Sequence, residues 1–364
     1  MRLASTLFRY MALRILFAAT VILAGLLGLI FMIDLIEILR SLGARGGVDL
    51  PRAASMAALR APKLGEQLLP FVFLFGSMWA MATLSRRSEL VVMRAAGVSA
   101  WRILGPALGV AGATGVLVVT VVNPLGARAM EQAQVLRASA AGESGTRVSL
   151  TAGGLWLRQS DGARSAVISA ARVEDGGALL EDVTVFLFDG QDVFRQRVDA
   201  ATGEFREGDL RLFDCSLSFP DEPSRFQKTF VIATPFEADS IGETAQPPET
   251  LSVWELPKFV RLAKESGFPA ARYEMHWHNL IATPLKLAAM ALIAGAFCMQ
   301  TRRSGGMFQL VLSGVGAGFA LYVTAELAEA LGESAANLAP LAAWTPTLAA
   351  ALLAATLILH LEDG

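Results

Sequence analysis

Few residues in this sequence have the types and spacing of a catalytic or metal site. A protein that hydrolyses ATP would need a phosphate-binding loop. Such a loop ends in Gly-Lys-Ser or Gly-Lys-Thr, because its backbone amides and its lysine neutralise phosphate charge. None of the chain's lysines follows a glycine; they are Lys63, Lys228, Lys258, Lys264 and Lys286. We therefore expect no ATPase in this chain, and any ATP-driven work must come from a partner.

His276 and His278 flank Trp277 and are the next candidates. On a strand the two imidazoles would share a face, but on a helix side chains two residues apart diverge. We expect no metal site, because no third ligand lies nearby, and the alternative is an interfacial Trp-His belt at the end of a membrane span. The two cysteines, Cys215 and Cys298, indicate neither a disulfide framework nor a metal site. No Ser-His-acid set stands out, so an enzyme is unsupported.

Composition points to a membrane protein. The 364 residues are 54% hydrophobic and 18% charged, with a mean hydropathy of +0.48, which is unlike an ordinary soluble enzyme. The formal net charge of -2 gives no support to nucleic-acid binding. Uncharged runs of the length that a bilayer requires predict six spans: Ile15–Ile33, Gln67–Ser85, Ile103–Val122, Leu280–Thr301, Met307–Ala325 and Ala339–Leu361.

The distribution of basic residues predicts the orientation of these spans, because short basic loops stay in the cytoplasm. With six spans both termini are cytoplasmic, and the N-terminal run is a retained anchor rather than a cleaved signal peptide. A second group of basic residues falls on the outer side: Arg40, Arg45, Arg52, Arg60 and Lys63. These residues either balance local acids such as Asp34 and Glu37 or contact anionic lipid headgroups.

Residues 128–250 have the character of a water-soluble β domain inserted between two sets of three spans. They hold 20 of the chain's 33 carboxylates. Apolar residues alternate in short segments separated by Gly and Asp turns, which predicts an all-β sandwich or open barrel. After it, Ser252 and Glu255 have the spacing of a capping box, which predicts a short amphipathic helix leading back to the membrane. The predicted domains are 1–127, 128–250 and 251–364.

The loop after the second span contains a predicted helix at about 86–97, with Glu89 in its first turn and Gly97 as its stop. It is either a basic hairpin at the lipid headgroups or a helix offered to a partner's groove. Its candidate coupling residues are Arg86, Arg87, Glu89, Leu90, Met93 and Arg94. In the fifth span Gly314, Gly316 and Gly318 predict either ordinary close packing or a mobile gate. Lys286, in the fourth span, must snorkel, pair or face a cavity.

Together these features resemble the permease family of the lipopolysaccharide export system, LptF/LptG. The resemblance covers nearly the whole chain, and its most specific stretch is Arg87–Val98. Further matches are Gly154–Trp156, Arg272–Glu274 and Glu329–Glu333, and the runs 34–43 and 251–273 are closer to the LptG branch than to the LptF branch. The resemblance implies a membrane α-helical fold of six transmembrane helices (3+3) with an inserted periplasmic β-jellyroll.

The resemblance also implies a function for the chain. It would be a non-catalytic subunit that extracts lipopolysaccharide from the Gram-negative inner membrane into a V-shaped cavity shared with its LptF paralogue. An LptB dimer would supply ATP hydrolysis with magnesium, and LptC and LptA would receive the lipid. Lipid-binding candidates are Asp34, Glu37, Arg40, Arg45 and Lys286, although an acid at Asp34 departs from the family's basic pattern. The alternatives are the LptF subunit, a non-transporting scaffold with a protein-binding β domain, or a membrane enzyme.

Overall fold

The structure is a computed structural model that describes residues 2–43, 48–141, 147–151, 154–160, 164–174, 179–189, 193–206, 208–220, 222–234, 247–265, 270–300, 307–334 and 338–363. It divides the chain into two compact units, which are described separately. The helical unit comprises Met1–Ala133 and Glu274–Gly364, and the sheet unit comprises Gln134–Tyr273. The sheet unit begins at Gln134 and the helical unit resumes at Glu274, whereas the composition predicts these boundaries at residues 128 and 251.

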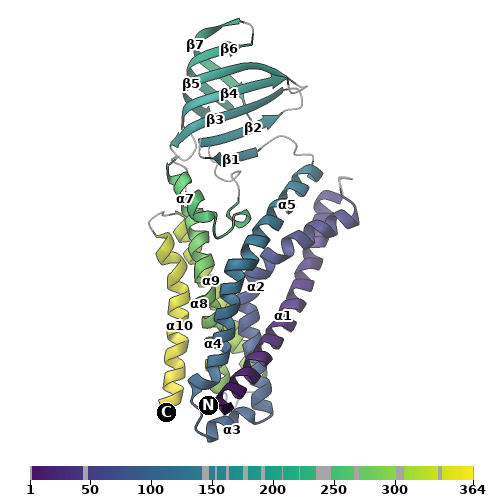
Figure 1. Cartoon of the computed structure of the whole chain (residues 1–364), viewed down its shortest axis with the longest axis vertical. Coiled ribbons are helices and arrows are strands. Elements are labelled where there is room, and N and C mark those ends of the chain that lie inside the picture. Colours follow the sequence, from purple (N-terminus) through teal and green to yellow (C-terminus); the bar gives the residue numbers. More distant parts are fainter. Residues whose placement is uncertain are drawn as a thin grey trace. The chain divides into compact units, whose positions relative to one another are not determined.

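Seven long helices and two short ones make up the described part of the helical unit and its connections (Figure 1). They are α1 (Arg2–Leu42), α2 (Leu50–Arg86), α3 (Glu89–Ala95), α4 (Ala100–Leu117), the π-helix η2 (Val118–Val122), α5 (Asn123–Ala141), α8 (Ala271–Gln300), α9 (Met307–Ser334) and α10 (Ala339–Asp363). Because a helix rises about 1.5 Å per residue, α1 and α2 are longer than the roughly 30 Å of a bilayer's hydrocarbon core. They therefore extend beyond the uncharged runs that located them.

Five helices in the described part of the chain are long and apolar enough to cross a membrane. They are Thr6–Leu42, Leu50–Arg86, Ala100–Ala140, Ala271–Met299 and Ala339–His360. The predicted span at 307–325 does form a helix, α9, but it is not among these five, and the side chains of its first residues lie outside the described part. The five spans and the inserted sheet confirm the expected class of fold.

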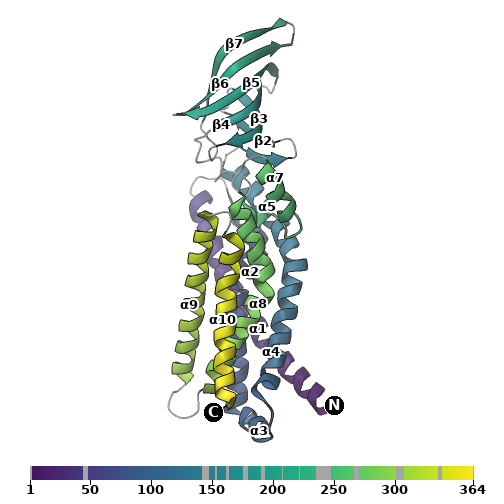
Figure 2. The same ribbon diagram turned by 90° about the vertical axis from the view of Figure 1, so that its left-hand side faces the viewer.

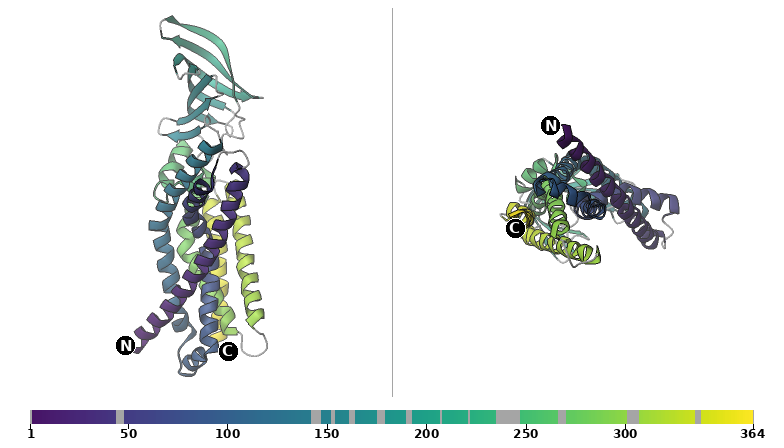
Figure 3. Two further views of the ribbon diagram at one scale, coloured as in Figure 1. Left: turned by 90° about the vertical axis from the view of Figure 1, so that its right-hand side faces the viewer. Right: turned by 90° about the horizontal axis from the view of Figure 1, so that it is seen from below.

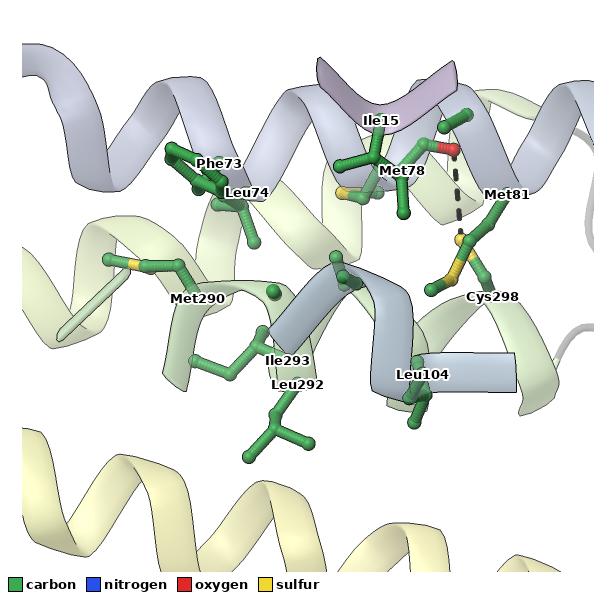
Figure 4. Close-up of a cluster of buried hydrophobic side chains, with 14 of the residues drawn as sticks. Ile15, Phe73, Leu74, Met78, Met81, Leu104, Met290, Leu292, Ile293 and Cys298 are labelled. Carbon is green, nitrogen blue, oxygen red and sulfur yellow. Dashed lines mark hydrogen bonds between the residues drawn. The ribbon is translucent and has the colours of Figure 1, made fainter. Parts of the chain in front are cut away.

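Close packing holds the helical unit together. Figure 4 shows its core, in which Ile15 of α1 and Phe73 of α2 lie near Leu104 of α4 and Met290 of α8. Because lipid tails are as apolar as leucine, tight contact rather than exclusion of water must hold such helices together. Gly115 of α4 illustrates this, because a Cβ there would collide with backbone atoms of Pro284 on α8.

The helices of this unit pair along their lengths. α1 packs along α2 and also contacts α4, and α9 packs along α10. Figure 3 shows α1 crossing its neighbours obliquely, and Figure 2 shows α9 and α10 side by side. At the crossing of α1 and α2, a Cβ on Gly76 would lie 3.0 Å from the Cα of Ala19. The small residue permits the two backbones to approach this closely.

The sheet unit is a seven-stranded antiparallel sheet in which strands follow one another in chain order. Its strands are β1 (Arg147–Thr151), β2 (Gly154–Ser160), β3 (Arg164–Glu174), β4 (Leu179–Asp189), β5 (Phe194–Arg206), β6 (Asp209–Phe219) and β7 (Glu222–Ala233). The predicted alternation is confirmed, because Leu155, Leu157, Val183, Val185 and Leu210 are all buried. This all-β meander is compatible with the expected jellyroll. Most predicted turn residues, including 161–163 and 175–178, lie outside the described residues.

After the sheet, the short 3-10 helix η4 (Pro248–Thr250) leads to α7 (Leu256–Glu265). The predicted capping box is present. The backbone N–H of Ser252 and its Oγ both donate to Oε2 of Glu255, at 3.0 and 2.6 Å. The helix is amphipathic as predicted, with Leu256 and Ala263 fully buried on one side. The helix predicted from this capping box is confirmed, and it begins at Leu256, four residues after Ser252.

Candidate functional site

The loop between α2 and α4 is shaped by two left-handed residues on either side of α3. Ser88 has a φ of 58° and Gly97 a φ of 80°, a region that glycine enters without strain. The backbone N–H of Gly97 donates to the carbonyl of Arg94 at 3.0 Å, and that of Val98 donates to the carbonyl of Met93 at 3.1 Å. This pair of bonds is a Schellman motif, which ends the helix at a defined point. The predicted stop at Gly97 is confirmed.

The six candidate coupling residues occupy this loop in different environments. Leu90 is 8% exposed and belongs to the hydrophobic core of the helical unit. Met93 packs against that core. Glu89 and Arg94 are half-buried, whereas Arg86 and Arg87 are exposed. The outer face of α3 is apolar as well, with Val91 62% and Val92 65% exposed. These exposed valines form an apolar surface on a short, capped helix that the described part of the chain does not cover.

Two side-chain contacts tie this loop to distant helices. The hydroxyl of Tyr10 on α1 donates to Oε2 of Glu89 at 3.0 Å, and the guanidinium of Arg14 lies 5.2 Å from the centre of the Tyr10 ring. At the start of α4, the backbone N–H of Ala100 donates to Oε1 of Glu362 on α10 at 3.2 Å. A displacement of α3 would therefore act on α1 and α10 as well as on its own flanking helices.

The acid that departs from the family's pattern has an internal partner. Nη1 of Arg60 on α2 donates to Oδ1 of Asp34 on α1 at 2.5 Å, and only 24% and 11% of these side chains are exposed. One and two turns further along α1, Glu37 and Arg40 are exposed. Arg45 lies outside the described residues. Asp34 therefore joins two helices, while Arg40 is the basic candidate whose side chain reaches the surface of the chain.

Lys286, the remaining lipid-binding candidate, lies apart from this group on α8. It is half-buried, and the carboxylates whose charges act on it are Glu329 and Glu326 of α9. A lysine inside an apolar helix is costly unless it faces an opposite charge. The charges of these two acids fit the pairing alternative for Lys286.

A buried polar cluster, which we define as Lys63, Glu66, Asn123 and His276, lies elsewhere in the helical unit. Nζ of Lys63 is 3.2 Å from Oε2 of Glu66 and 3.4 Å from Nε2 of His276. Nδ2 of Asn123 lies 3.2 Å from both carboxylate oxygens of Glu66. The exposed fractions of Lys63, Glu66 and Asn123 are 4%, 9% and 0%. The cluster therefore joins α2, α5 and α8 through hydrogen bonds in a buried setting.

The two histidines point to different partners, as expected for a helix. His276 faces Lys63, whereas Nδ1 of His278 accepts a hydrogen bond from Nε1 of Trp344 on α10 at 3.4 Å. Within the described part of the chain, no group of three or more His, Cys, Asp or Glu side chains is placed to hold a metal ion.

The three candidate gate glycines differ in their surroundings. A Cβ on Gly314 would collide with the side chain of Met78, and one on Gly318 would collide with Leu74. A Cβ on Gly316 would meet no atom within 4 Å. Gly314 and Gly318 therefore serve the close packing of α9 on α2, and only Gly316 faces open space.

Comparison with known proteins gives this architecture a family. The family model described as "Lipopolysaccharide export system permease LptF/LptG" matches residues 9–360. The chain belongs to this family. It is similar to the lipopolysaccharide export system permease protein LptG of Haemophilus influenzae, with 29% identity over 331 residues and 89% of each chain covered. It is also similar to the LptG protein of Escherichia coli K12, with 26% identity over 307 residues, 83% of this chain and 82% of the relative.

As a member of the LptF/LptG family, the chain is a lipopolysaccharide transport permease. A permease is a transporter subunit, and the membrane location that this role requires agrees with the five apolar helices. The family membership also confirms the resemblance on which the sequence-based interpretation of the whole chain rested.

Sequence reasoning missed Glu66 and Asn123 as members of a site. It placed Lys63 among the outer basic residues and gave His276 to an aromatic belt. One signal was present, because Lys63 and Glu66 are three residues apart and lie on one helical face beside an apolar run. Asn123 lies 57 residues after Glu66, and His276 lies 213 residues after Lys63. Nothing in the local sequence could show that these two residues complete the cluster.

Proposed function

We propose that the chain is the LptG subunit of an ATP-driven exporter in the inner membrane of a Gram-negative bacterium. In this proposal it pairs with an LptF paralogue, extracts lipopolysaccharide from the membrane and passes it through its periplasmic sheet toward LptC and LptA. Both termini are cytoplasmic. ATP hydrolysis with magnesium takes place in an LptB dimer, and this chain itself is not a catalyst.

The observation that carries the proposal is the combination of exposure and attachment at α3. Val91 and Val92 offer an apolar surface to a partner's groove. Behind that surface, Leu90 is packed in the helical core and Glu89 is hydrogen-bonded to Tyr10 of α1. A partner that pushes on the valines would therefore move α1 rather than bend a loose loop. This is the linkage that a permease without its own motor requires.

The basic residues at the other end of α1 suit the anionic headgroup of the transported lipid. Phosphate groups bind guanidinium through charge-assisted hydrogen bonds. We assign the headgroup contact to Arg40, because it is exposed, and extend it to Arg45 from the sequence alone. Asp34 contributes indirectly by positioning Arg60. Glu37 is an acid and would repel a phosphate, and the half-buried Lys286 is already influenced by the charges of Glu329 and Glu326.

Co-purification with the ATPase tests the attachment. The full chain is expressed with an LptB-type ATPase and an LptF paralogue, either as wild type or carrying Val91→Asp and Val92→Asp. We expect the aspartates to abolish recovery of the ATPase, since each would place a charge in an apolar interface. Val231→Asp is the matched control, because Val231 is 51% exposed on β7 and lies far from α3 in the sequence.

If the wild-type chain recovers no ATPase, the proposal is contradicted. The remaining interpretation is then a scaffold that does not transport lipid. Chain that recovers ATPase equally well with and without the aspartates would place the attachment elsewhere. Exchange of the LptF partner for an LptG partner tests the assignment to LptG, because an LptG subunit should form a stable complex with the first and not with the second.

A further inference from the structure

The exposed face of α7 is strongly basic and lies next to an exposed tryptophan. Lys258, Arg261 and Lys264 recur every three residues and are all exposed, while Leu256 and Ala263 on the opposite side are buried. Trp254, two residues before the helix, is 61% exposed. Basic side chains beside an exposed tryptophan are typical of segments that lie at a membrane interface.

Trp254 is held in a fixed turn rather than on a loose loop. Ser252 and Glu255 are joined by the capping box, and the backbone N–H groups of Glu255 and Leu256 both donate to the carbonyl of Ser252 at 3.0 Å. Val253, directly before the tryptophan, is 5% exposed. The indole is therefore displayed outward by a turn whose neighbours are anchored in the sheet unit.

α7 is attached directly to a membrane helix. The ring of Phe259 on α7 lies 4.5 Å, centre to centre, from the ring of Tyr273 in the first turn of α8. That turn opens the apolar span Ala271–Met299 and belongs to the same compact unit as α7. Glu265 and Ala271 are six residues apart, so at most about 20 Å of extended chain separates them. α7 must therefore remain close to the point where α8 enters the bilayer.

We propose that α7 is an interfacial anchor that binds the anionic phospholipid headgroups of the bilayer around α8. Lys258, Arg261 and Lys264 contact the phosphates, and the indole of Trp254 inserts at the level of the headgroups. Four acids of the described residues lie near this face in the sequence or through Tyr273. Glu255 is engaged by Ser252, Glu265 lies at the end of the helix, and Glu249 and Glu274 are half-buried. Arg272, exposed in the first turn of α8, adds a further positive charge beside Tyr273.

This anchor does not depend on the transport cycle. It would fix the level and tilt at which the sheet unit leaves the membrane, whether or not a motor is bound. Each basic residue near an anionic surface increases the population bound there about fivefold. Three such residues are enough to hold a helix that is already tethered at its end.

Quenching of Trp254 by lipid tests the proposal on the full chain. The chain is reconstituted in nanodiscs of phosphatidylcholine, with or without phosphatidylglycerol, and with brominated acyl chains as the quencher. The difference between wild type and Trp254→Phe isolates the emission of this residue. We expect clear quenching of Trp254 that increases with phosphatidylglycerol and decreases with added salt.

A charge variant and its control show whether the basic residues of α7 cause the response of Trp254 to phosphatidylglycerol. Lys258→Gln, Arg261→Gln and Lys264→Gln, combined in one chain, should remove the response to phosphatidylglycerol. The control Arg206→Gln, Arg225→Gln and Lys228→Gln changes the net charge equally at exposed positions of the sheet and should leave the response intact. Trp254 that remains unquenched, or that ignores phosphatidylglycerol, would overturn the proposal. Equal loss in the control would overturn it too, because the effect would then follow net charge and not α7.

Discussion

The side-chain amide of Asn123 lies 3.2 Å from both carboxylate oxygens of Glu66 and joins α5 to α2. Asn123 is fully buried and is the first residue after the π-helix Val118–Val122. A π-helix inside an α-helix often marks a functional position. Here it coincides with the residue that reaches across to the buried acid. Within this cluster, Glu66 therefore accepts hydrogen bonds from Asn123 of α5 and faces Lys63, which lies on α2 like Glu66 itself.

Replacement of Asn123 by alanine should destabilise the helical unit. The carboxylate of Glu66 would lose a buried donor, and an unsatisfied buried polar group costs about 1–3 kcal/mol, or more when it is charged. Thermal unfolding in detergent measures the effect. Thr120→Ala is the control, because Thr120 is exposed within the same π-helix and its hydroxyl donates to the carbonyl of Val116 one turn earlier. An Asn123 variant as stable as this control would contradict the assignment.

Lys63 and Glu66 should be replaceable together but not singly. Glu66→Leu alone leaves Lys63 as a buried charge and should cost about 3–5 kcal/mol. Lys63→Met with Glu66→Leu removes both charges at similar volume and should recover most of that loss. Chemical denaturation of Glu66→Leu, of Lys63→Met and of the double variant gives the coupling energy. Additive losses would show that the two side chains do not interact.

Glycine to alanine substitutions should destabilise the helical unit in a defined order. Gly115→Ala should cost most, because its Cβ meets the backbone of Pro284, which cannot move without α8. Gly314→Ala and Gly318→Ala meet the flexible side chains of Met78 and Leu74 and should cost about 1–3 kcal/mol. Gly316→Ala meets open space and should be neutral or slightly stabilising, since alanine favours helix by about 1 kcal/mol. Melting temperatures in detergent test the order, and a Gly316 variant that melts lowest would contradict it.

Cys215 should react slowly with thiol reagents in the folded protein. It is fully buried on β6, and burial, as the largest cause, raises the pKa of its thiol above the ordinary 9.0. A raised pKa favours the neutral thiol, so its contribution to stability is present below pH 9 and is lost as pH rises through the folded pKa. Labelling of a Cys298→Ala variant by a maleimide across pH 7 to 10 measures this. Rapid labelling near pH 8 without unfolding would contradict the burial of the thiol.

Tyr10 and Glu89 should be energetically coupled in function more than in stability. Tyr10 is 40% exposed and Glu89 is half-buried, so loss of this hydrogen bond near the surface should cost less than about 1 kcal/mol. If the bond transmits motion from α3 to α1, Tyr10→Phe and Glu89→Gln should each lower lipid transport per ATP hydrolysed. The double variant should be no worse than the more severe single one. Independent, multiplicative losses would show that the two residues act separately.

Features with a local cause could be predicted from the sequence. The helix at α3, its stop at Gly97 and the capping box of Ser252 and Glu255 all follow from residues within one or two turns. The strands followed from the alternation of residues such as Leu155 and Leu157. These patterns are strong because a helix cap or a half-buried strand imposes its requirement on neighbouring residues.

Contacts between distant segments could not be predicted in the same way. The partner of Asp34 is Arg60, on the next helix, and only the packing of α1 on α2 shows it. The sequence left open whether the outer basic residues balance acids or bind lipid, and the structure gives Arg60 the first role. α1 and α2 extend beyond the predicted spans, because uncharged runs mark the bilayer and not the charged ends of these helices.

The most direct test of the account is ATP-dependent release of lipopolysaccharide from proteoliposomes that contain this chain with its paralogue and the ATPase. The account predicts that wild type releases lipid to a periplasmic acceptor when ATP and magnesium are added. The chain carrying Val91→Asp and Val92→Asp should release none, and Val231→Asp should match wild type. Equal release by all three variants, or none by wild type, would contradict the claim that α3 couples ATP hydrolysis to lipid export.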